Sequence, residues 1–262
     1  MIYLEYKDFD DLYHNFTRLL VTDFDKYEKD TFTVGSTIYL NNVIISTQSC
    51  DCHLDMSDFN YTRVKWTTLV NKYINKENYF DLKDRLITST AKTLTFNFNI
   101  HVGRSTDKDK TKNRDSCLVA LVFSRPGNSG KWTSVNIYYR VTEIFKKFAI
   151  DLILFNRMFN DLPNLNIKEY LIHIPQPFYS TFILSELVDT LFDIKEFDKP
   201  DNFICSKIVN SYERYYGENA EESKYHAIAR KQKMKKENII RDPIPIESLF
   251  IFNDKYVEKP LW

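Results

Sequence analysis

The sequence predicts an α+β protein in which helices pack on a largely continuous sheet. Apolar residues recur at helical spacing in three segments, 7–20, 61–87 and 180–192. Segments rich in β-branched residues, or alternating between apolar and polar residues, occupy 31–47, 93–102 and 117–140. Helices and strands are mixed without strict alternation, and this order favours the α+β class.

The first half of the chain reads as a helix, a hairpin, a helix and a strand. Residues 7–20 form an amphipathic first helix, and 31–47 form a hairpin that turns at Asn41-Asn42. A second helix spans 61–87, and one of its faces carries Trp66, Leu69, Val70 and Tyr73. Alternation over 93–102 then predicts a half-buried strand.

Residues 104–115 contain no apolar side chain, so we expect an exposed loop there. A hairpin of two strands, 117–123 and 132–140, follows it and turns through 124–131. The stretch 143–162 is too apolar all round for a surface helix, which predicts a helix at the centre of the core.

A short strand at 170–174 is expected to end at Pro175 and Pro177, and Ser180 is a candidate N-cap for the helix 180–192. We expect residues 1–205 to form the core, and 206–262 to form a charged helical extension whose apolar tail docks on the protein. Within the extension, 230–241 holds six Lys or Arg against one Glu. This basic stretch is either a solvated helix face or a contact for nucleic acid or protein.

The composition excludes several classes. Of the 262 residues, 36 are Lys or Arg and 36 are Asp or Glu, so no overall charge attracts polyanions or anionic lipid. Because the chain contains only 5 Gly, we do not expect a glycine-rich phosphate loop. No stretch approaches the roughly 20 apolar residues of a membrane span, and the start has no signal-peptide pattern. We therefore expect a folded, soluble, intracellular (cytoplasmic) protein that is not bound to a membrane.

The four cysteines are few and irregularly spaced, which favours reduced thiols. Cys50, Cys52 and His53 carry the usual donors for zinc, but a tetrahedral site needs four ligands and no second pair follows at such spacing. We therefore expect no metal. Cys117 opens a strand whose hairpin returns to Arg140, and a cation lowers the pKa of a thiol. Cys117 is thus either a nucleophile or an ordinary cysteine at a strand edge.

Asp151 lies inside the apolar sequence FAIDLILF, where a bare carboxylate is costly unless it is paired or protonated. Its side chain either caps a helix that starts at Leu152 or faces a ligand within the core.

The stretch from Cys117 to Phe192 resembles thymidylate synthases and their relatives, the phage deoxycytidylate hydroxymethylases. In that family a Cys opens a strand, and a hairpin returns as an aromatic strand that ends in Tyr-x-Arg-Ser-x-Asp. A Phe-rich helix follows, and then a strand leading to His-x-Tyr-Ser. The stretches that match here are Cys117–Phe123, Ile137–Glu143, Phe148–Asp151 and Pro177–Ser180. TFTVGSTIYL and TRVKWTTLV are similar to the family's N-terminal hairpin and next helix, so the resemblance covers roughly 31–192.

The resemblance implies a thymidylate-synthase-like three-layer fold with a mixed sheet, and a homodimer whose sheets pack back to back. It implies that the Cys117 thiolate adds to C6 of a pyrimidine nucleotide, so that C5 attacks the one-carbon group of methylenetetrahydrofolate. Arg140 would hold the phosphate and help to keep the thiol ionised, and Tyr179 would bind the sugar hydroxyl. Asp151 stands where the synthases have Asn and the cytosine-specific hydroxymethylases have Asp. A protonated carboxyl donates to cytosine N3 and accepts from the N4 amino group.

Four positions differ from the family: Lys65, Leu118, Val141 and Pro177 replace its catalytic Glu, a His, a Ser and a second His. Two hypotheses follow. The first is C5 hydroxymethyl or methyl transfer to a cytosine-type nucleotide. The second is a pseudoenzyme, an inactive dimeric scaffold that binds protein or nucleic acid through 230–241. The low-glycine composition, rich in Asn, Lys, Ile, Phe and Tyr, indicates an AT-rich genome, and a viral source would suit either hypothesis.

Overall fold

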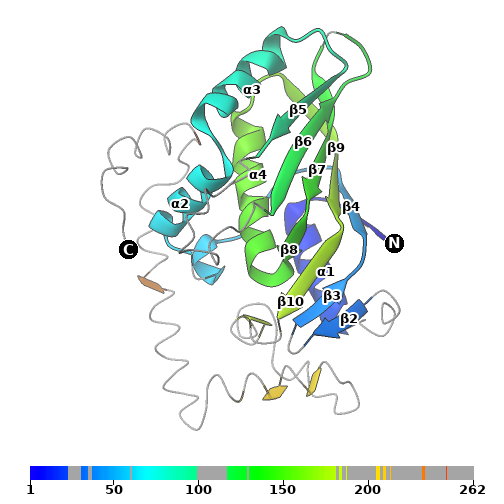
Figure 1. Ribbon diagram of the computed structural model, residues 1–262, viewed down its shortest axis with the longest axis vertical. Helices are drawn as coiled ribbons and strands as arrows, with labels where there is room; N and C mark the ends of the chain where they lie inside the picture. Colours follow the sequence, from blue (N-terminus) through cyan, green and yellow to red (C-terminus); the bar gives the residue numbers. More distant parts are fainter. Residues whose placement is uncertain are drawn as a thin grey trace, which may run out of the picture.

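The structure is a computed structural model (Figure 1). It describes the ranges 1–22, 31–34, 37–59, 61–98, 117–128 and 130–180, together with residues 183–184, 187, 205–206, 209–210, 213, 232–233 and 246. The predicted loop at 104–115 and most of the basic stretch 230–241 lie outside these residues. Gln232 and Lys233 of that stretch are described and are exposed.

A mixed six-stranded sheet forms the centre of the protein. Its order is β1 (Ile2–Tyr6), β4 (Val43–Thr47), β9 (Leu165–Ile174), β7 (Trp132–Tyr139), β6 (Leu118–Ser124) and β5 (Thr93–Asn97). The pairs β1–β4 and β7–β9 are parallel, and the other three pairs are antiparallel. The sheet and its helices confirm the predicted α+β class. The thymidylate-synthase-like three-layer arrangement stays a prediction.

A second sheet has the order β2 (Thr31–Val34), β3 (Thr37–Leu40), β10 (Gln176–Ser180) and β8 (Val141–Glu143). The chain passes between the two sheets at Asn41–Asn42, Arg140 and Pro175. The Asn42 N–H donates to the Pro175 carbonyl at 2.8 Å, which brings two of these crossings together. Arg140 therefore stands at a crossing between the sheets.

The predicted hairpin turn at Asn41-Asn42 is wrong. β3 pairs with β2 and β10, whereas β4 pairs with β1 and β9, so the two strands belong to different sheets. Asn42 has a φ of 51°, a left-handed conformation that Asn tolerates. Here it leads the chain from one sheet to the other. Pro177 does not end a strand either, because it lies within β10 opposite Thr142 of β8.

Four α-helices lie within the described residues: α1 (Phe9–Thr22), α2 (Arg63–Tyr73), α3 (Lys76–Thr88) and α4 (Ala149–Asp161). The single helix expected over 61–87 is therefore two helices. Short helical turns precede α2 and α4, namely η2 (Met56–Phe59) and the π-helical η3 (Ile144–Phe148). None of the helices in this part of the chain is long and apolar enough to cross a membrane.

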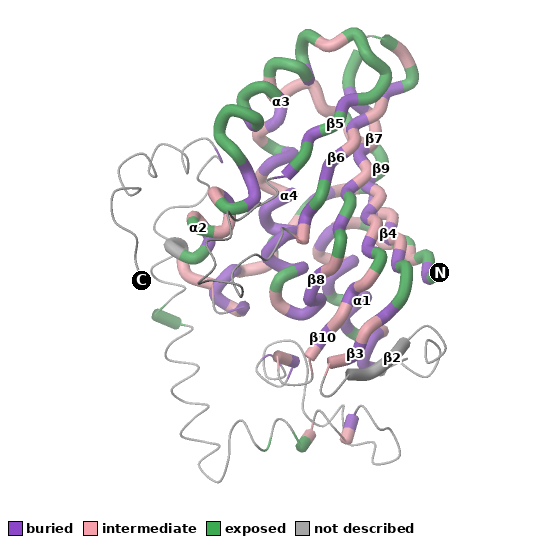
Figure 2. Tube along the Cα trace, in the orientation of Figure 1, coloured by how far each residue is buried: buried purple, intermediate pink, exposed green. Residues whose placement is uncertain are grey.

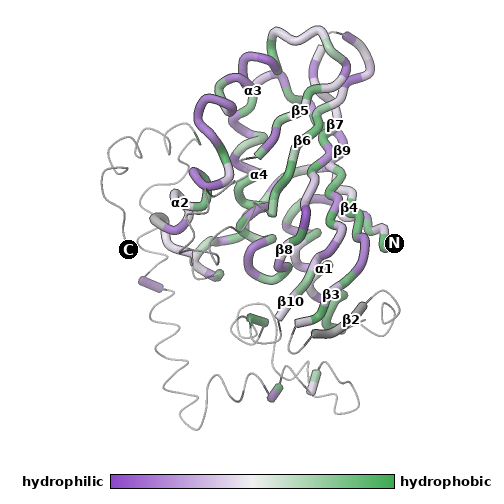
Figure 3. The backbone as a smooth tube through the Cα atoms, viewed as in Figure 1, coloured by the Kyte–Doolittle hydropathy of each residue, from purple (hydrophilic) through white to green (hydrophobic). Residues whose placement is uncertain are grey.

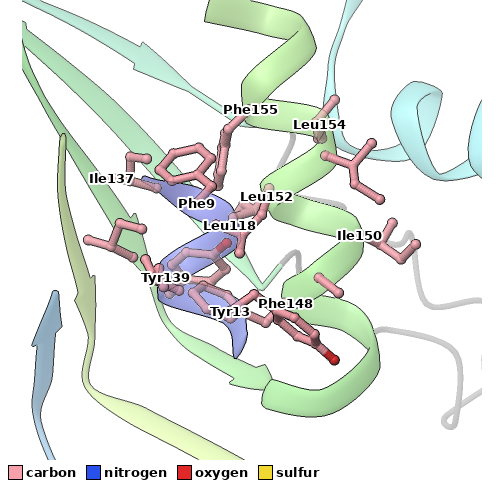
Figure 4. Packing of buried hydrophobic residues seen from close by; sticks show 14 of the residues in the cluster. Phe9, Tyr13, Leu118, Ile137, Tyr139, Phe148, Ile150, Leu152, Leu154 and Phe155 are labelled. Atoms are coloured by element: carbon pink, nitrogen blue, oxygen red, sulfur yellow. The ribbon is translucent and has the colours of Figure 1, made fainter. Parts of the chain in front are cut away.

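Helices α1 and α4 pack on the same face of the six-stranded sheet, which we call the inner face (Figure 4). Phe9 of α1 and Phe159 of α4 both contact Tyr170 of β9, with ring centroids 5.5 and 5.2 Å apart. Phe155 of α4 contacts Tyr139 of β7 at 6.2 Å. Figure 2 shows α4 buried along most of its length, as its apolar sequence predicts, and Figure 3 shows that the neighbouring β6 is largely hydrophobic.

Glu143 fixes the start of the helical run that leads into α4. Its buried carboxylate accepts hydrogen bonds from the backbone N–H groups of Phe145, Lys146 and Lys147 at 3.0, 2.8 and 3.2 Å. These are orphan donors that a helix start leaves without intrahelical partners. Burial raises the pKa of Glu143, and the three N–H groups oppose that rise. The cap fixes the position of Lys147 and the start of α4.

Part of the chain beyond 180 joins the core. Leu184, Leu187, Cys205 and Ile246 are buried there, and the Ile246 N–H donates to the Asp161 carboxylate at 2.7 Å. The described residues among 180–192 are helical from 183 onward, and Ser180 is the last residue of β10.

Candidate functional site

Cys117 and Arg140 lie together at the open end of the β6–β7 hairpin. The Arg140 N–H donates to the Cys117 carbonyl at 2.9 Å. Leu118 pairs with Tyr139 and Ala120 with Tyr138, so Val119 is an extra residue that bulges the strand two residues after the cysteine. Cys117 is half-buried and Arg140 is exposed. The hairpin therefore brings the backbones of Cys117 and Arg140 together at the crossing that follows β7.

Asp151 lies in the first turn of α4 and is 1% exposed. The hydroxyl of Tyr139 approaches its carboxyl. Neither carboxyl oxygen of Asp151, nor that hydroxyl, completes a hydrogen bond with any residue in the described part of the chain. The capping account of Asp151 is therefore wrong: the cap is Glu143, eight residues earlier, and Asp151 lies inside a continuous helical run.

Burial raises the pKa of Asp151 well above its ordinary value, and Lys147 and the Tyr139 hydroxyl only oppose this rise. Lys147 precedes Asp151 by one helical turn, but it is exposed and forms no close ion pair with it among the described contacts. Burial therefore favours the protonated form of the Asp151 carboxyl. In that form it offers one O–H donor and one carbonyl acceptor.

The pKa of the Cys117 thiol is also raised. Burial is the main cause and a charged Asp151 would add to it, whereas Lys147, Arg140 and Lys72 lower the pKa. A protonated Asp151 would remove its own share of the rise. The net shift is upward from an ordinary value of 9.0, so the protonated thiol is favoured at neutral pH. Arg140 favours ionisation, as expected, but does not achieve it.

Tyr73 and Tyr61 complete the cluster from the α2 side. Tyr73 is the last residue of α2 and is buried, and Tyr61 is half-buried just before that helix. Burial raises the pKa of both hydroxyls, and Asp151 adds to the rise in each. Tyr73 also interacts with Cys117. The sequence analysis saw Tyr73 only as part of a helix face, because apolar periodicity does not distinguish a core aromatic from one beside a site.

Tyr179 lies apart from this cluster. Its side chain is buried, its hydroxyl donates to the Leu20 carbonyl at 3.2 Å, and its ring packs edge-on against Phe145 at 5.2 Å. Within the described residues, no interaction joins Tyr179 to Cys117 or Asp151. The structure thus brings together Cys117, Arg140 and Asp151, three of the four predicted site residues.

The residues of the Cys50–His53 motif do not share one set of neighbours. Cys50 is buried beside Tyr170, whereas His53 is exposed and its ring nitrogen contacts the Asp10 carboxylate at 2.6 Å. The described residues contain no group of three or more His, Cys, Asp or Glu that could hold a metal ion.

No protein-family model matches this chain, and no curated protein matches it.

Replacing Asp151 with Asn should stabilise the protein at pH 7. The unfolded chain releases the Asp151 proton near pH 3.8, whereas the folded chain holds it to a higher pH. Stability should therefore fall as the pH rises from 3.8 through the folded pKa, and Asn removes that loss. We expect a gain of about 1–3 kcal/mol at pH 7 that shrinks towards pH 4, measured by urea unfolding.

Asp81→Asn, at an exposed position on α3, is the control and should give no such gain. A less stable Asp151→Asn variant at pH 7 would mean that the native carboxylate is ionised and paired.

Proposed function

We propose that this protein binds a pyrimidine nucleotide at the Cys117 end of β6, with cytosine preferred over uracil, and transfers a hydroxymethyl or methyl group to C5 of the base. The observation that supports the proposal is the Asp151 carboxyl, which is buried near Cys117, has a raised pKa and has no hydrogen-bond partner for either oxygen among the described residues. An unpaired buried polar group costs about 1–3 kcal/mol. A ligand that completes its hydrogen bonds removes that cost.

The protonation state of Asp151 favours cytosine. A neutral carboxyl donates its O–H to the unprotonated N3 of cytosine, while its second oxygen accepts from the N4 amino group. Uracil presents N3–H and a carbonyl at O4, so its donor and acceptor order is reversed. The Tyr139 hydroxyl beside the carboxyl is likewise unpartnered, and adds a group that can donate or accept.

Cys117 is positioned to act as the nucleophile in this proposal. In that role its thiolate would add to C6, and the electron pair of the C5–C6 double bond would move to C5, which makes C5 the carbon nucleophile. Loss of the C5 proton and elimination of the thiolate would later restore the double bond. Lys147, Arg140 and Lys72 favour the thiolate that the first step needs, because each lowers the pKa of Cys117.

The resemblance assigns methylenetetrahydrofolate as the one-carbon donor of an active enzyme. A pterin ring carries several donors and acceptors of its own and needs matching protein groups. Among the described residues beside Cys117, the unpartnered buried polar groups are those of Asp151 and Tyr139, which suffice for one base. These residues do not fit a pterin as well, so no step is derived through the folate, and its use stays a prediction.

The raised pKa of Cys117 favours a second candidate, an inactive relative that keeps the fold as a scaffold for protein or nucleic acid. Leu118 and Pro177 are buried where the family has histidines, which agrees with a loss of proton-transfer groups.

Calorimetric titration with dCMP and dUMP tests the pyrimidine site. We expect the wild-type protein to bind dCMP about tenfold or more tightly than dUMP, and Asp151→Asn to reverse the preference because an amide presents the complementary pattern. Asp81→Asn should leave the preference unchanged. If neither nucleotide binds at millimolar concentration, the scaffold candidate replaces the enzyme.

We also propose that the protein is a homodimer joined through the outer face of the six-stranded sheet, opposite α1 and α4. Strand register places one row of residues across this face: Ala120, Tyr138, His173, Ile44 and Tyr3. The next row is Val122, Asn136, Leu171, Ser46 and Glu5. Burial lowers the pKa of His173, so Glu5 is the one charged residue of these ten at neutral pH.

An outer face that meets only water normally alternates to polar and charged residues. On this face Tyr138 and His173 instead stack with ring centroids 4.6 Å apart, and Tyr3 and Tyr138 stay exposed. A second copy of the same sparsely charged face is a suitable partner, because two sheets pack face to face through such rows.

Sedimentation equilibrium tests the dimer. We expect a dimer for the wild-type protein and a monomer for Tyr138→Glu, because two buried carboxylates would oppose each other across the symmetric interface. Phe80→Glu, at an exposed aromatic residue of α3, should remain dimeric. A wild-type monomer at micromolar concentration would contradict this assignment.

A further inference from the structure

Two aromatic contacts hold Tyr139 opposite Asp151. Asp151 lies three residues after Phe148 and four before Phe155, so all three share one face of the helical run that continues as α4. The Tyr139 ring packs edge-on against both phenylalanines, with ring centroids 5.9 and 6.2 Å apart. Figure 4 shows Tyr139 on the strand side of this contact and the two phenylalanines on the helix side. The contacts therefore set the phenol against the turn that carries Asp151.

Three polar atoms lie in this contact without a completed hydrogen bond. Both carboxyl oxygens of Asp151 and the Tyr139 hydroxyl are buried and unpartnered within the described part of the chain. Asp151 is 1% and Tyr139 is 3% exposed, so bulk water does not satisfy them. The hydroxyl still favours the ionised carboxyl, as a phenol that points its O–H at a carboxylate does. Tyr139 is thus placed to act on the carboxyl that would read the base.

A neutral carboxyl does not choose between cytosine and uracil unless its proton is fixed. With the proton on one oxygen, the carboxyl donates to N3 of cytosine and accepts from the N4 amino group. With the proton on the other oxygen, it donates to O4 of uracil and accepts from N3–H. The two oxygens of an isolated carboxyl are equivalent, so both forms are available to it. The burial that favours protonation of Asp151 therefore does not by itself produce a base preference.

We infer that the Tyr139 hydroxyl fixes the Asp151 proton on one carboxyl oxygen, and that this asymmetry sets the preference between the two bases. An oxygen that accepts the phenol O–H serves as the acceptor, and the proton stays on the other oxygen. Phe148 and Phe155 hold the ring, so the hydroxyl approaches the carboxyl from one direction. This inference rests on the proposed pyrimidine site. It gives a positioning role to Tyr139, which occupies the variable position of the Tyr-x-Arg motif.

Calorimetric titration of the full chain with dCMP and dUMP tests the positioning role. Tyr139→Phe keeps the ring that packs on the helix and removes an unpartnered buried hydroxyl, so the variant should fold. We expect the ratio of the two affinities to fall from about tenfold or more to less than about threefold, because the carboxyl then presents either form. The tighter affinity should fall by less than about tenfold, since Asp151 still binds the base.

Tyr170→Phe is the matched control. Tyr170 of β9 packs on Phe159 of α4 with ring centroids 5.2 Å apart, and Phe159 lies eight residues, about 12 Å, beyond Asp151. This variant also removes a buried phenol hydroxyl from the inner face. It should leave the affinity ratio unchanged.

The carboxyl ¹³C resonance of Asp151 tests the hydroxyl without a nucleotide. In Tyr139→Phe the resonance should shift, and its titration midpoint should lie at a higher pH, because the variant lacks a donor that favours the carboxylate. In Tyr170→Phe both should stay as in the wild-type protein. A resonance that Tyr139→Phe leaves unchanged would overturn the positioning role.

The outcomes separate the positioning role from the proposed function. If Tyr139→Phe keeps the wild-type affinity ratio, the positioning role is overturned and the nucleotide site stands. If the wild-type protein prefers dUMP and Tyr139→Phe loses that preference, the positioning role stands and the assignment to cytosine fails. If neither nucleotide binds at millimolar concentration, the pyrimidine site fails and the base preference fails with it, even where the ¹³C resonance shows that the hydroxyl acts on the carboxyl.

Discussion

The hydrogen bonds that Glu143 accepts from three backbone N–H groups start the helix on which the rest of the structure depends. They begin the helical run directly after β8, at a crossing between the two sheets. The run then continues as α4 along the inner face of the six-stranded sheet, where its aromatic side chains meet those of β7 and β9. Because α4 is buried on so many sides, any polar residue in its first turn is taken out of water.

Asp151 is that residue, and its burial links the fold to the chemistry. The raised pKa of a carboxyl in this position lowers stability at neutral pH, because the unfolded chain ionises it more readily than the folded chain does. Natural proteins keep such groups where a ligand uses them, at a cost in stability. The same burial that keeps Asp151 neutral also raises the pKa of the nearby thiol. For the proposed nucleotide, the site is therefore better suited to recognising the base than to attacking it.

The sequence predicted the elements whose signals are local. The first helix, the hairpin from 117 to 140 and the core helix within 143–162 follow from periodicity and apolar content, and the structure confirms them. Asn41-Asn42 was misassigned because a left-handed Asn serves a hairpin turn and a crossing between sheets equally well. The split of 61–87 into α2 and α3 depends on Ile74 and Asn75, whose capping role a periodic pattern does not show.

The site was predictable only in part. Cys117, Arg140 and Asp151 were proposed from the order of motifs, and the hairpin and α4 bring them together. In the sequence analysis Glu143 was only the last residue of the matching stretch Ile137–Glu143. Its capping role depends on backbone geometry, which composition does not show. Lys72 and Lys147 carry no motif, and their electrostatic effect on Cys117 emerges only from the folded structure.

The protonation state of Asp151 is the central claim, and carboxyl ¹³C NMR measures it directly. The Asp151 resonance, assigned by its loss in Asp151→Asn, should keep the chemical shift of a protonated carboxyl at pH 7 and show no midpoint near 3.8. A resonance that titrates near pH 3.8, as an exposed aspartate does, would contradict the account of the site.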